Sequence, residues 1–286
     1  MNTRLLFIHA LSPLHPGTGQ SIGAIDLAIA RDRATGVPYL PGSSLKGALR
    51  GRRPEGVDVI GIFGPDTANA NEHSGSVLFG DANLILLPVR SVAGTFAWVT
   101  APYVLGRLAR DLAEVGVSSP AIPQVDDSAC HTTAESRLLV NIKKADKVVF
   151  EDLDLNPTSD ASPWAKLLAE RLFEDDYWAK SLRQRFCVVS DDVFTFLAQQ
   201  ATDVSARIRM DQATGTVEDG ALWYEENLPA ESVLASLIMA QPRGRVRDVN
   251  VILEGVGKCI EGSVQLGGNA TVGRGRCAIR MTGGDA

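Results

Sequence analysis

The stretch RDVNVILEGVGKCIEGSVQLGGNATVGRGRCAIRM, residues 247–281, decides the fold class of this chain. It predicts a helix, a short strand, a glycine-rich loop and a final strand, in that order. Near the other end, RLLFIHAL (4–11) predicts a first strand that stops at Ser12-Pro13. This ending fits a ferredoxin-like sheet, whose first and last strands lie near one another. We therefore expect an α+β fold with a ferredoxin-like core.

Between these ends the chain alternates between patterns typical of strands and of helices. The segments in chain order are a strand with a glycine break (75–89), a strand running into a helix (96–116), a strand pair (136–155) and an amphipathic helix (162–175).

Residues 194–229 predict a protruding hairpin. A helical pattern leads into two short strand-like arms, ARIRM (206–210) and ALWYE (221–225). A polar region of ten residues, 211–220, separates the arms and contains two glycines. Glycine is common in such turns because it accepts a positive φ without steric cost.

The loop after the first strand, HPGTGQSIGAID (15–26), is rich in glycine. A backbone without Cβ atoms comes close to phosphate with its N–H groups free, so the loop indicates a nucleotide or a nucleic-acid backbone. Its glycines, at 17, 19 and 23, have the wrong spacing for a dinucleotide fingerprint. In PGSSLKGALR (41–50) the serines precede the lysine, which excludes a P-loop. A nucleic-acid backbone is the ligand that remains.

Charge is distributed unevenly along the 286 residues, whose net charge is −6. Residues 1–53 carry seven Lys/Arg and two acidic residues (+5), and residues 240–286 carry seven and four (+3). The remaining middle therefore carries −14. If the termini meet, they form one basic face on an acidic body. The negative net charge argues against a nucleic-acid partner, but this distribution of charge favours one. The alternative is that these cations are ordinary solvated surface.

Part of this positive charge lies on one predicted helix. PYLPGSSLKGALRGRR (38–53) predicts a Pro-Gly turn, a serine N-cap at 43 or 44 and a short helix. Lys46, Arg50 and Arg53 fall at i, i+4 and i+7 and would form a basic stripe.

Composition excludes several other classes. No apolar run is long enough to span a bilayer, and the N-terminus does not resemble a signal peptide. The four cysteines include no C-x-x-C, which favours buried, reduced thiols and a cytoplasmic location. Cys130-His131 is only half of a zinc site. Only 6% of residues are aromatic, so recognition of bases by stacking is not indicated.

Four segments together resemble the repeated backbone subunit of the type III-B CRISPR effector, the Cmr complex, within the RAMP superfamily of RNA-binding proteins. The similarity is close over residues 5–50, fair at 207–229 and 262–281, and absent over about 117–195. The segments are LHPGTGQSIGAID (14–26), PYLPGSSLKGALR (38–50), ALWYEENLP (221–229) and LGGNATVGRGR (266–276).

This resemblance implies a single RAMP domain over 1–286. Its parts would be a modified ferredoxin-like (RRM-like) palm and a thumb hairpin at about 204–229. We further expect helical insertions in the fold and an insertion at about 117–195, where the similarity is absent. The resemblance further implies copies stacked head to tail along a CRISPR guide RNA, other complex subunits as partners, and cleavage of a complementary target RNA at regular intervals. Sequence recognition would then be left to guide–target pairing.

The resemblance also implies which residues hold RNA. Lys46 and Arg50 match guide-phosphate contacts, with a solvent-facing position as their alternative. The glycine loops match RNA-facing segments, two arginines are added for their charge alone, and two apolar residues of the hairpin are candidate wedges into the guide–target duplex. The glycines are Gly17, Gly19, Gly267, Gly268, Gly273 and Gly275, the arginines are Arg274 and Arg276, and the candidate wedges are Met210 and Trp223.

Asp26 matches the family's cleavage aspartate, and we expect it to accept a proton or to hold a divalent metal, Mg²⁺ or Mn²⁺. One carboxylate can suffice, since RNA supplies its own 2′-OH nucleophile. The alternative is a turn aspartate that bonds the local backbone. His15 and Glu226 are further candidates for the chemistry, although His15 would alternatively orient the loop. Two other functions stay open, a purely structural RNA-binding scaffold and a guide-processing ribonuclease that acts alone.

Overall fold

The protein is a mixed α+β structure in a computed structural model that describes residues 2–19, 25–65, 74–210 and 214–283. Its helices in these ranges are α1 (Gly42–Gly51), α2 (Val59–Phe63), α3 (Pro102–Glu114), α4 (Ser162–Leu172), α5 (Asp176–Arg185), α6 (Asp191–Gln200), α7 (Val249–Ile260) and a 3₁₀ turn, η2 (Ala270–Val272). Its strands are β1 (Thr3–Ala10), β2 (Tyr39–Leu40), β3 (Val77–Phe79), β4 (Ala82–Arg90), β5 (Phe96–Thr100), β6 (Ala129–Thr132), β7 (Leu139–Ile142), β8 (Ala145–Phe150), β9 (Leu153–Asp160), β10 (Phe186–Val188), β11 (Asp203–Met210), β12 (Val217–Asn227), β13 (Val233–Ala240), β14 (Ser263–Gln265) and β15 (Arg276–Thr282).

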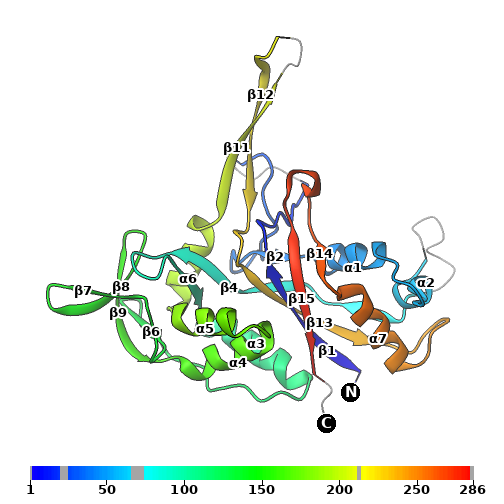
Figure 1. Ribbon diagram of the computed structural model, residues 1–286, viewed down its shortest axis with the longest axis horizontal. Helices are drawn as coiled ribbons and strands as arrows, with labels where there is room; N and C mark the ends of the chain where they lie inside the picture. Colours follow the sequence, from blue (N-terminus) through cyan, green and yellow to red (C-terminus); the bar gives the residue numbers. More distant parts are fainter. Residues whose placement is uncertain (1, 20–24, 66–73, 211–213, 284–286) are drawn as a thin grey trace.

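The two ends of the chain meet near one edge of the main sheet, and they lie side by side as the sequence predicts. The strand order there is β14-β15-β1-β13-β4, and β1 pairs antiparallel with both β15 and β13. Phe7 on β1 lies opposite Arg280 on one side and Ala235 on the other. The N- and C-terminal segments consequently run side by side in Figure 1.

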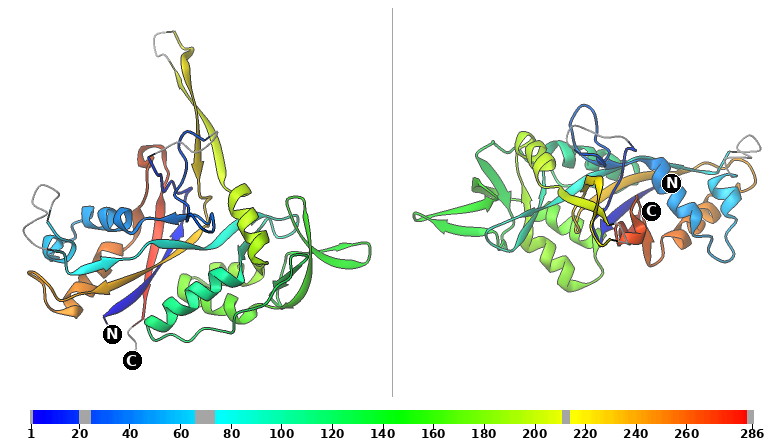
Figure 2. Two further views of the ribbon diagram at one scale, coloured as in Figure 1. Left: turned by 180° about the vertical axis from the view of Figure 1, so that it is seen from behind. Right: turned by 90° about the horizontal axis from the view of Figure 1, so that it is seen from above.

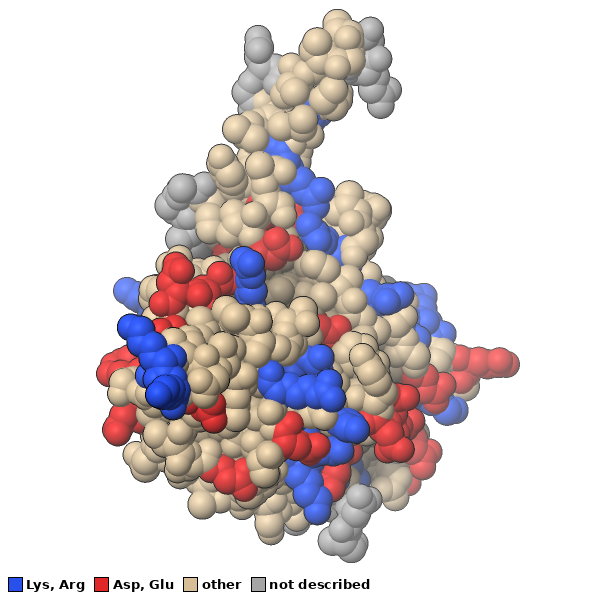
Figure 3. All heavy atoms as spheres, turned by 60° about the vertical axis from the view of Figure 1, so that its left-hand side comes forward, with Lys and Arg blue, Asp and Glu red and all other residues tan. Residues whose placement is uncertain are grey.

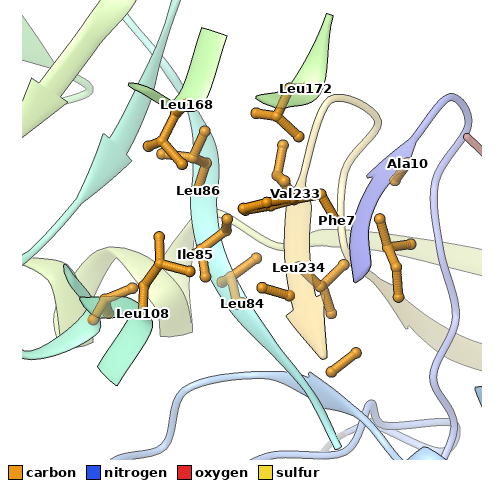
Figure 4. Close-up of a cluster of buried hydrophobic side chains, with 14 of the residues drawn as sticks. Phe7, Ala10, Leu84, Ile85, Leu86, Leu108, Leu168, Leu172, Val233 and Leu234 are labelled. Atoms are coloured by element: carbon orange, nitrogen blue, oxygen red, sulfur yellow. The ribbon is translucent and has the colours of Figure 1, made fainter. Parts of the chain in front are cut away.

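Apolar side chains of these strands form one core with the helices on the same side. Figure 4 shows Phe7 and Val233 facing Leu84 and Leu86, with Leu108 of α3 and Leu168 of α4 closing the cluster. All six are at most 1% exposed. Burial of such side chains is the main favourable contribution to folding, about 1.5–3 kcal/mol for each.

The segment at 117–195 corrects the expectation of helical insertions. It contains α4 and α5, but it also contains strands that extend the main sheet in the order β5-β10-β6-β9-β8-β7. β10 and β6 have only three and four residues, too few for an alternating pattern to be recognised. Figures 1 and 2 show α3, α4 and α5 together on one face of this extension.

β11 and β12 form a separate two-stranded sheet that projects from the body (Figure 1). We call it the hairpin. β12 begins at Val217, so the expected turn at 211–220 was too long, and residues 211–213 lie outside the described ranges. On one side of the hairpin Ile208 lies opposite Leu222, and these side chains are 51% and 55% exposed.

α1 differs from its prediction at both ends. It begins at Gly42 with Pro41 at the N-cap and no side-chain cap, so the serine cap at 43 or 44 was wrong. Instead, the Gly42 N–H donates to Asp81 Oδ1 at 2.8 Å. Arg53 lies beyond the helix with a φ of +46°, which reduces the basic stripe to Lys46 and Arg50.

The remaining class expectations concern membranes and cysteines. Among the described helices, none has the length and apolarity to cross a bilayer. The four cysteines are free and buried, as expected. The described residues contain no group of three or more His, Cys, Asp or Glu arranged to hold a metal, and Cys130-His131 gains no partner pair there.

Candidate nucleic-acid interface

Backbone hydrogen bonds hold the first glycine-rich loop against residues 224–228 at the base of the hairpin. We call this part of the hairpin its foot. The N–H groups of Leu14 and Leu228 each donate to the other residue's carbonyl at 2.8 Å. Further along, Leu27 N–H donates to the Tyr224 carbonyl at 3.0 Å, and Glu226 N–H donates to the Leu27 carbonyl at 3.0 Å. The loop thus runs along β12, although residues 20–24 lie outside the described ranges.

Asp26 is an exposed carboxylate with a defined position in this arrangement. Its Oδ2 accepts a hydrogen bond from Tyr224 N–H at 2.8 Å. The bond runs to a strand 198 residues away in the sequence, so among the described residues the carboxylate links its loop to β12. No described residue donates to Oδ1. One oxygen therefore fixes the side chain at the base of the hairpin, and the residue is exposed.

His15 is buried where three segments meet. Its Nδ1 lies 2.7 Å from the Glu226 carbonyl oxygen. That oxygen only accepts hydrogen bonds, so Nδ1 carries a proton. The C-terminal loop packs against the same residue, since Gly268 N–H donates to the His15 carbonyl at 2.9 Å. A Cβ at Gly267, whose φ is +69°, would collide with that carbonyl.

Glu226 is buried and fully engaged by protein donors. Its Oε1 pairs with Arg31 Nη2 at 2.5 Å and accepts from Thr202 Oγ1 at 2.9 Å. Its Oε2 accepts from Ile29 N–H at 3.1 Å. These bonds join the segment after the first loop, the turn between α6 and β11, and β12 around one carboxylate.

Glu225, the residue before Glu226, was missed by sequence reasoning. It points to the other side of β12 and is 3% exposed. Its oxygens lie 3.4 Å from Arg207 Nε and 3.6 Å from Arg274 Nε, and Asn227 Nδ2 donates to it at 3.1 Å. Burial acts to raise the pKa of Glu225, but the Asn227 hydrogen bond and the two arginines outweigh it and lower the pKa overall.

The C-terminal glycine loop is held in place through this cluster. Arg274 belongs to the loop and is largely buried beside Glu225, whereas Arg276 is exposed. A Cβ at Gly275 would collide with the Leu266 carbonyl, so only glycine fits there. Among the described residues, no atom lies within 4 Å of the corresponding point at Gly273, nor at Gly19 in the first loop. Space around Gly17 is taken by the His15 ring.

Three buried nitrogens of the cluster have no hydrogen-bond acceptor in the described part of the chain. They are Arg207 Nε, Arg274 Nε and Asn269 Nδ2. Unsatisfied donors of this kind are uncommon in folded proteins and call for an explanation. Figure 3 shows basic side chains that follow the lower part of the hairpin towards the body, while its outer part carries few charges.

α1 supplies a second basic element. Lys46 and Arg50 lie one helical turn apart and are half-buried. Burial lowers the pKa of the Lys46 ammonium, and the neighbouring Arg50 charge lowers it further. A bound anion would favour both charges. Beyond the helix, the Arg52 guanidinium donates to the Glu261 carbonyl at 2.7 Å and to the Ser263 carbonyl at 2.5 Å, which fixes α1 beside β14.

The two expected wedge residues differ in their surroundings. Met210 is 47% exposed near the end of β11. Trp223 is half-buried opposite Arg207, on the side of the hairpin that faces Glu225. Ile208, Leu222 and Tyr224 are more exposed than Trp223 and lie on the other side.

Comparison with known proteins gives consistent relatives over nearly the whole chain. The family model of the RAMP superfamily matches residues 7–278. The chain is 38% identical to the "CRISPR system Cmr endoribonuclease Cmr4" of Pyrococcus furiosus, over 98% of this chain and 96% of that protein. It is 26% identical to the "CRISPR system CMR subunit Cmr4" of Saccharolobus solfataricus, over 96% and 94%.

Solved structures show the same similarity in three dimensions. Oligomeric Cmr4 from Pyrococcus furiosus matches with a TM-score of 0.77 and 31% identity, covering 100% of both chains. A chain of the type III-B Cmr-beta complex bound to cognate target RNA matches in fold, with a TM-score of 0.74 and 21% identity over 98% and 96% of the chains. The full-length family match and the 38% identical relative show that this chain belongs to the RAMP superfamily.

Proposed function

We propose that the protein is the repeated RNA-binding backbone subunit of a type III-B CRISPR effector and that it cleaves complementary target RNA. The observation that carries the proposal is the exposed Asp26 carboxylate, fixed by Tyr224 N–H at the foot of the hairpin. A relative that matches nearly the whole chain is named as an endoribonuclease, and similar solved chains include an oligomer and an RNA-bound complex.

The proposal includes a ferredoxin-like, RRM-like palm in a single RAMP domain. The strand order β15-β1-β13-β4, with α1 after β1 and α7 before β15, supports this finer description. The hairpin is then the thumb, which separates guide from target once in each subunit. In an open row of copies, such spacing would produce a regular series of products.

RNA would be held by the two glycine loops, by Lys46 and Arg50 of α1, and by the arginines beside Glu225. Arg207 and Arg274 are paired with Glu225, and their remaining positive charge would favour a phosphate backbone nearby. None of these groups reads a base edge, which leaves sequence recognition to pairing with the guide.

In the chemical step, Asp26 would take the proton of the 2′-OH or orient that hydroxyl towards the adjacent phosphorus. His15 and Glu226 would position this group, because both are buried and bonded to the backbone of the Asp26 loop or of β12. This assignment replaces a direct catalytic role for His15 and Glu226 with a positioning role.

A divalent metal fits the exposed face of Asp26. Mg²⁺ is commonly bound by one or two carboxylates together with substrate phosphates and water, so one protein carboxylate is sufficient. When bound, the ion would stabilise negative charge that develops on the phosphate. Asp26 is the residue that would hold it.

Asp26→Asn tests the proposal. The amide keeps the size and accepts the Tyr224 hydrogen bond through its oxygen, but it removes the charge. We expect the assembled complex to bind guide and target normally and to cleave about 10²–10⁴-fold more slowly. Native gels check binding, and product sizing with and without Mg²⁺ or Mn²⁺ checks cleavage. Normal cleavage by the variant would instead favour the non-catalytic scaffold.

A further inference from the structure

Residues 243–247, RGRVR, form a tight turn between β13 and α7 that the proposed function does not use. We call it the arginine turn. Arg243 and Val246 form an antiparallel bridge across it, and Gly244 takes a φ of +63°, which suits glycine. The three arginine side chains, at 243, 245 and 247, are exposed.

The backbone of the arginine turn is anchored from below. Ser76 is fully buried, and its Oγ lies 2.5 Å from the Arg243 carbonyl and 2.9 Å from the Val246 carbonyl. Val246 packs against Gly61 of α2, where a Cβ would approach its Cγ2 to 2.7 Å. A buried hydroxyl and a packed valine thus fix the turn, so its arginines start from a defined backbone and lose less entropy on binding.

Protein acceptors do not neutralise this charge. Within the described ranges, Arg243 and Arg247 have no carboxylate at ion-pair distance, and Arg245 Nε is 4.0 Å from Asp58 Oδ2. Three positive charges within five residues repel one another, and a polyanion relieves that repulsion. All three are arginines, whose planar guanidinium matches the geometry of phosphate oxygens.

The turn lies far from Asp26. β13 runs from Val233, near the foot of the hairpin, to Ala240, and eight residues of strand span roughly 25 Å. Figure 1 shows the segment between β13 and α7 at the lower right side of the body, away from the hairpin. An RNA contact there involves another stretch of RNA than the one cleaved.

We propose that the arginine turn is a second binding site for the phosphodiester backbone of RNA. The inference rests on the proposed function only in taking RNA as the ligand. Its sources are the guide, the paired target and single-stranded target extending beyond the duplex, and the experiment separates them.

The test compares Arg243→Gln/Arg247→Gln with Lys143→Gln/Lys144→Gln in the assembled complex. The control removes two exposed lysines from the β7–β8 turn, so the lost charge is equal. Binding is measured over a range of salt for guide alone, guide with a target of equal length, and guide with a target carrying single-stranded extensions. For single-stranded RNA, we expect the arginine variant to have a log–log salt slope shallower by about 0.7 per lost contact, up to about 1.4, and the control to match wild type.

The arm in which the slope changes identifies the RNA strand that is bound. Unchanged slopes in all three arms would overturn the inference, as would equal changes in both variants. A change only in complex size by light scattering would also overturn it, because the turn would then bind a protein surface. Binding, not cleavage, is the readout, so the result stands even if Asp26 proves non-catalytic. Failure of the proposed function would appear as a wild-type complex that binds no RNA.

Discussion

The foot and the outer part of the hairpin are built from opposite kinds of residue. At the foot, the buried side chains are polar and bonded to other segments. His15 contacts the Glu226 carbonyl, the Glu225 carboxylate lies beside Arg274, and the Glu226 carboxylate accepts from the Ile29 N–H. In the outer part, Ile208 and Leu222 are half exposed and apolar. The difference teaches that one hairpin has two tasks: its foot fixes the position of Asp26, and its outer part stays available for contact.

The largest expected effect comes from breaking the foot with Glu226→Ala. This variant leaves Arg31 with backbone carbonyl partners but no carboxylate, and it also removes the acceptor of the Ile29 N–H and Thr202 hydroxyl. We expect the free energy of unfolding to fall by about 3–5 kcal/mol, measured by urea denaturation. Arg31→Met/Glu226→Leu, which removes both charges, should recover part of that loss. If the single variant is as stable as wild type, the foot is not what holds the loop.

Loss of the α1 charges should reduce RNA binding without this structural cost. We expect Lys46→Gln/Arg50→Gln to weaken guide binding about equally for all guide sequences. The salt slope should fall by about 0.7 for each lost contact with a single strand. Arg53→Gln is the matched control, because Arg53 lies outside the helix. Equal effects of both variants on the slope would contradict a specific contact by α1.

Acid should weaken the foot through Glu225. Its folded-state pKa is lowered, so it contributes stability above the unfolded pKa, near 4.5, and loses that contribution as pH falls through the folded pKa. We therefore expect Glu225→Gln to be less stable than wild type at neutral pH, with the difference shrinking as pH falls below about 4.5. Thermal unfolding of both proteins across pH 3–7 checks this, because a loss of stability lowers the midpoint temperature. A difference independent of pH would show that the charge of Glu225 plays no part.

The smallest effect on stability should come from the outer hairpin. We expect Ile208→Ser/Leu222→Ser to change unfolding free energy by less than about 0.5 kcal/mol per site, because both side chains are exposed. The spacing of cleavage products should nevertheless become irregular, as gel sizing will show. Val92→Ser/Leu139→Ser, which alters exposed apolar residues elsewhere, should leave the products unchanged. An unaltered ladder from the hairpin variant would remove its apolar face from the mechanism.

The sequence by itself determined the local elements and the pairing of the chain ends. Apolar runs such as residues 4–11 predict strands, and the closing helix, loop and strand predict that the ends meet, as β1 and β15 do. Residue type also indicated two glycine-rich loops that suit a phosphate backbone. Asp26 was predicted only through the resemblance to the RAMP superfamily, because residue type and spacing alone do not distinguish it from a turn aspartate.

Only the tertiary structure decided which polar groups are available. Glu225 and Glu226 are adjacent, and the strand pleat sends them to opposite sides, one to Arg207 and Arg274 and the other to Arg31. It also buried His15 and extended the sheet through strands of three or four residues. Burial and pairing of these groups depend on segments about 200 residues apart, which no local pattern encodes.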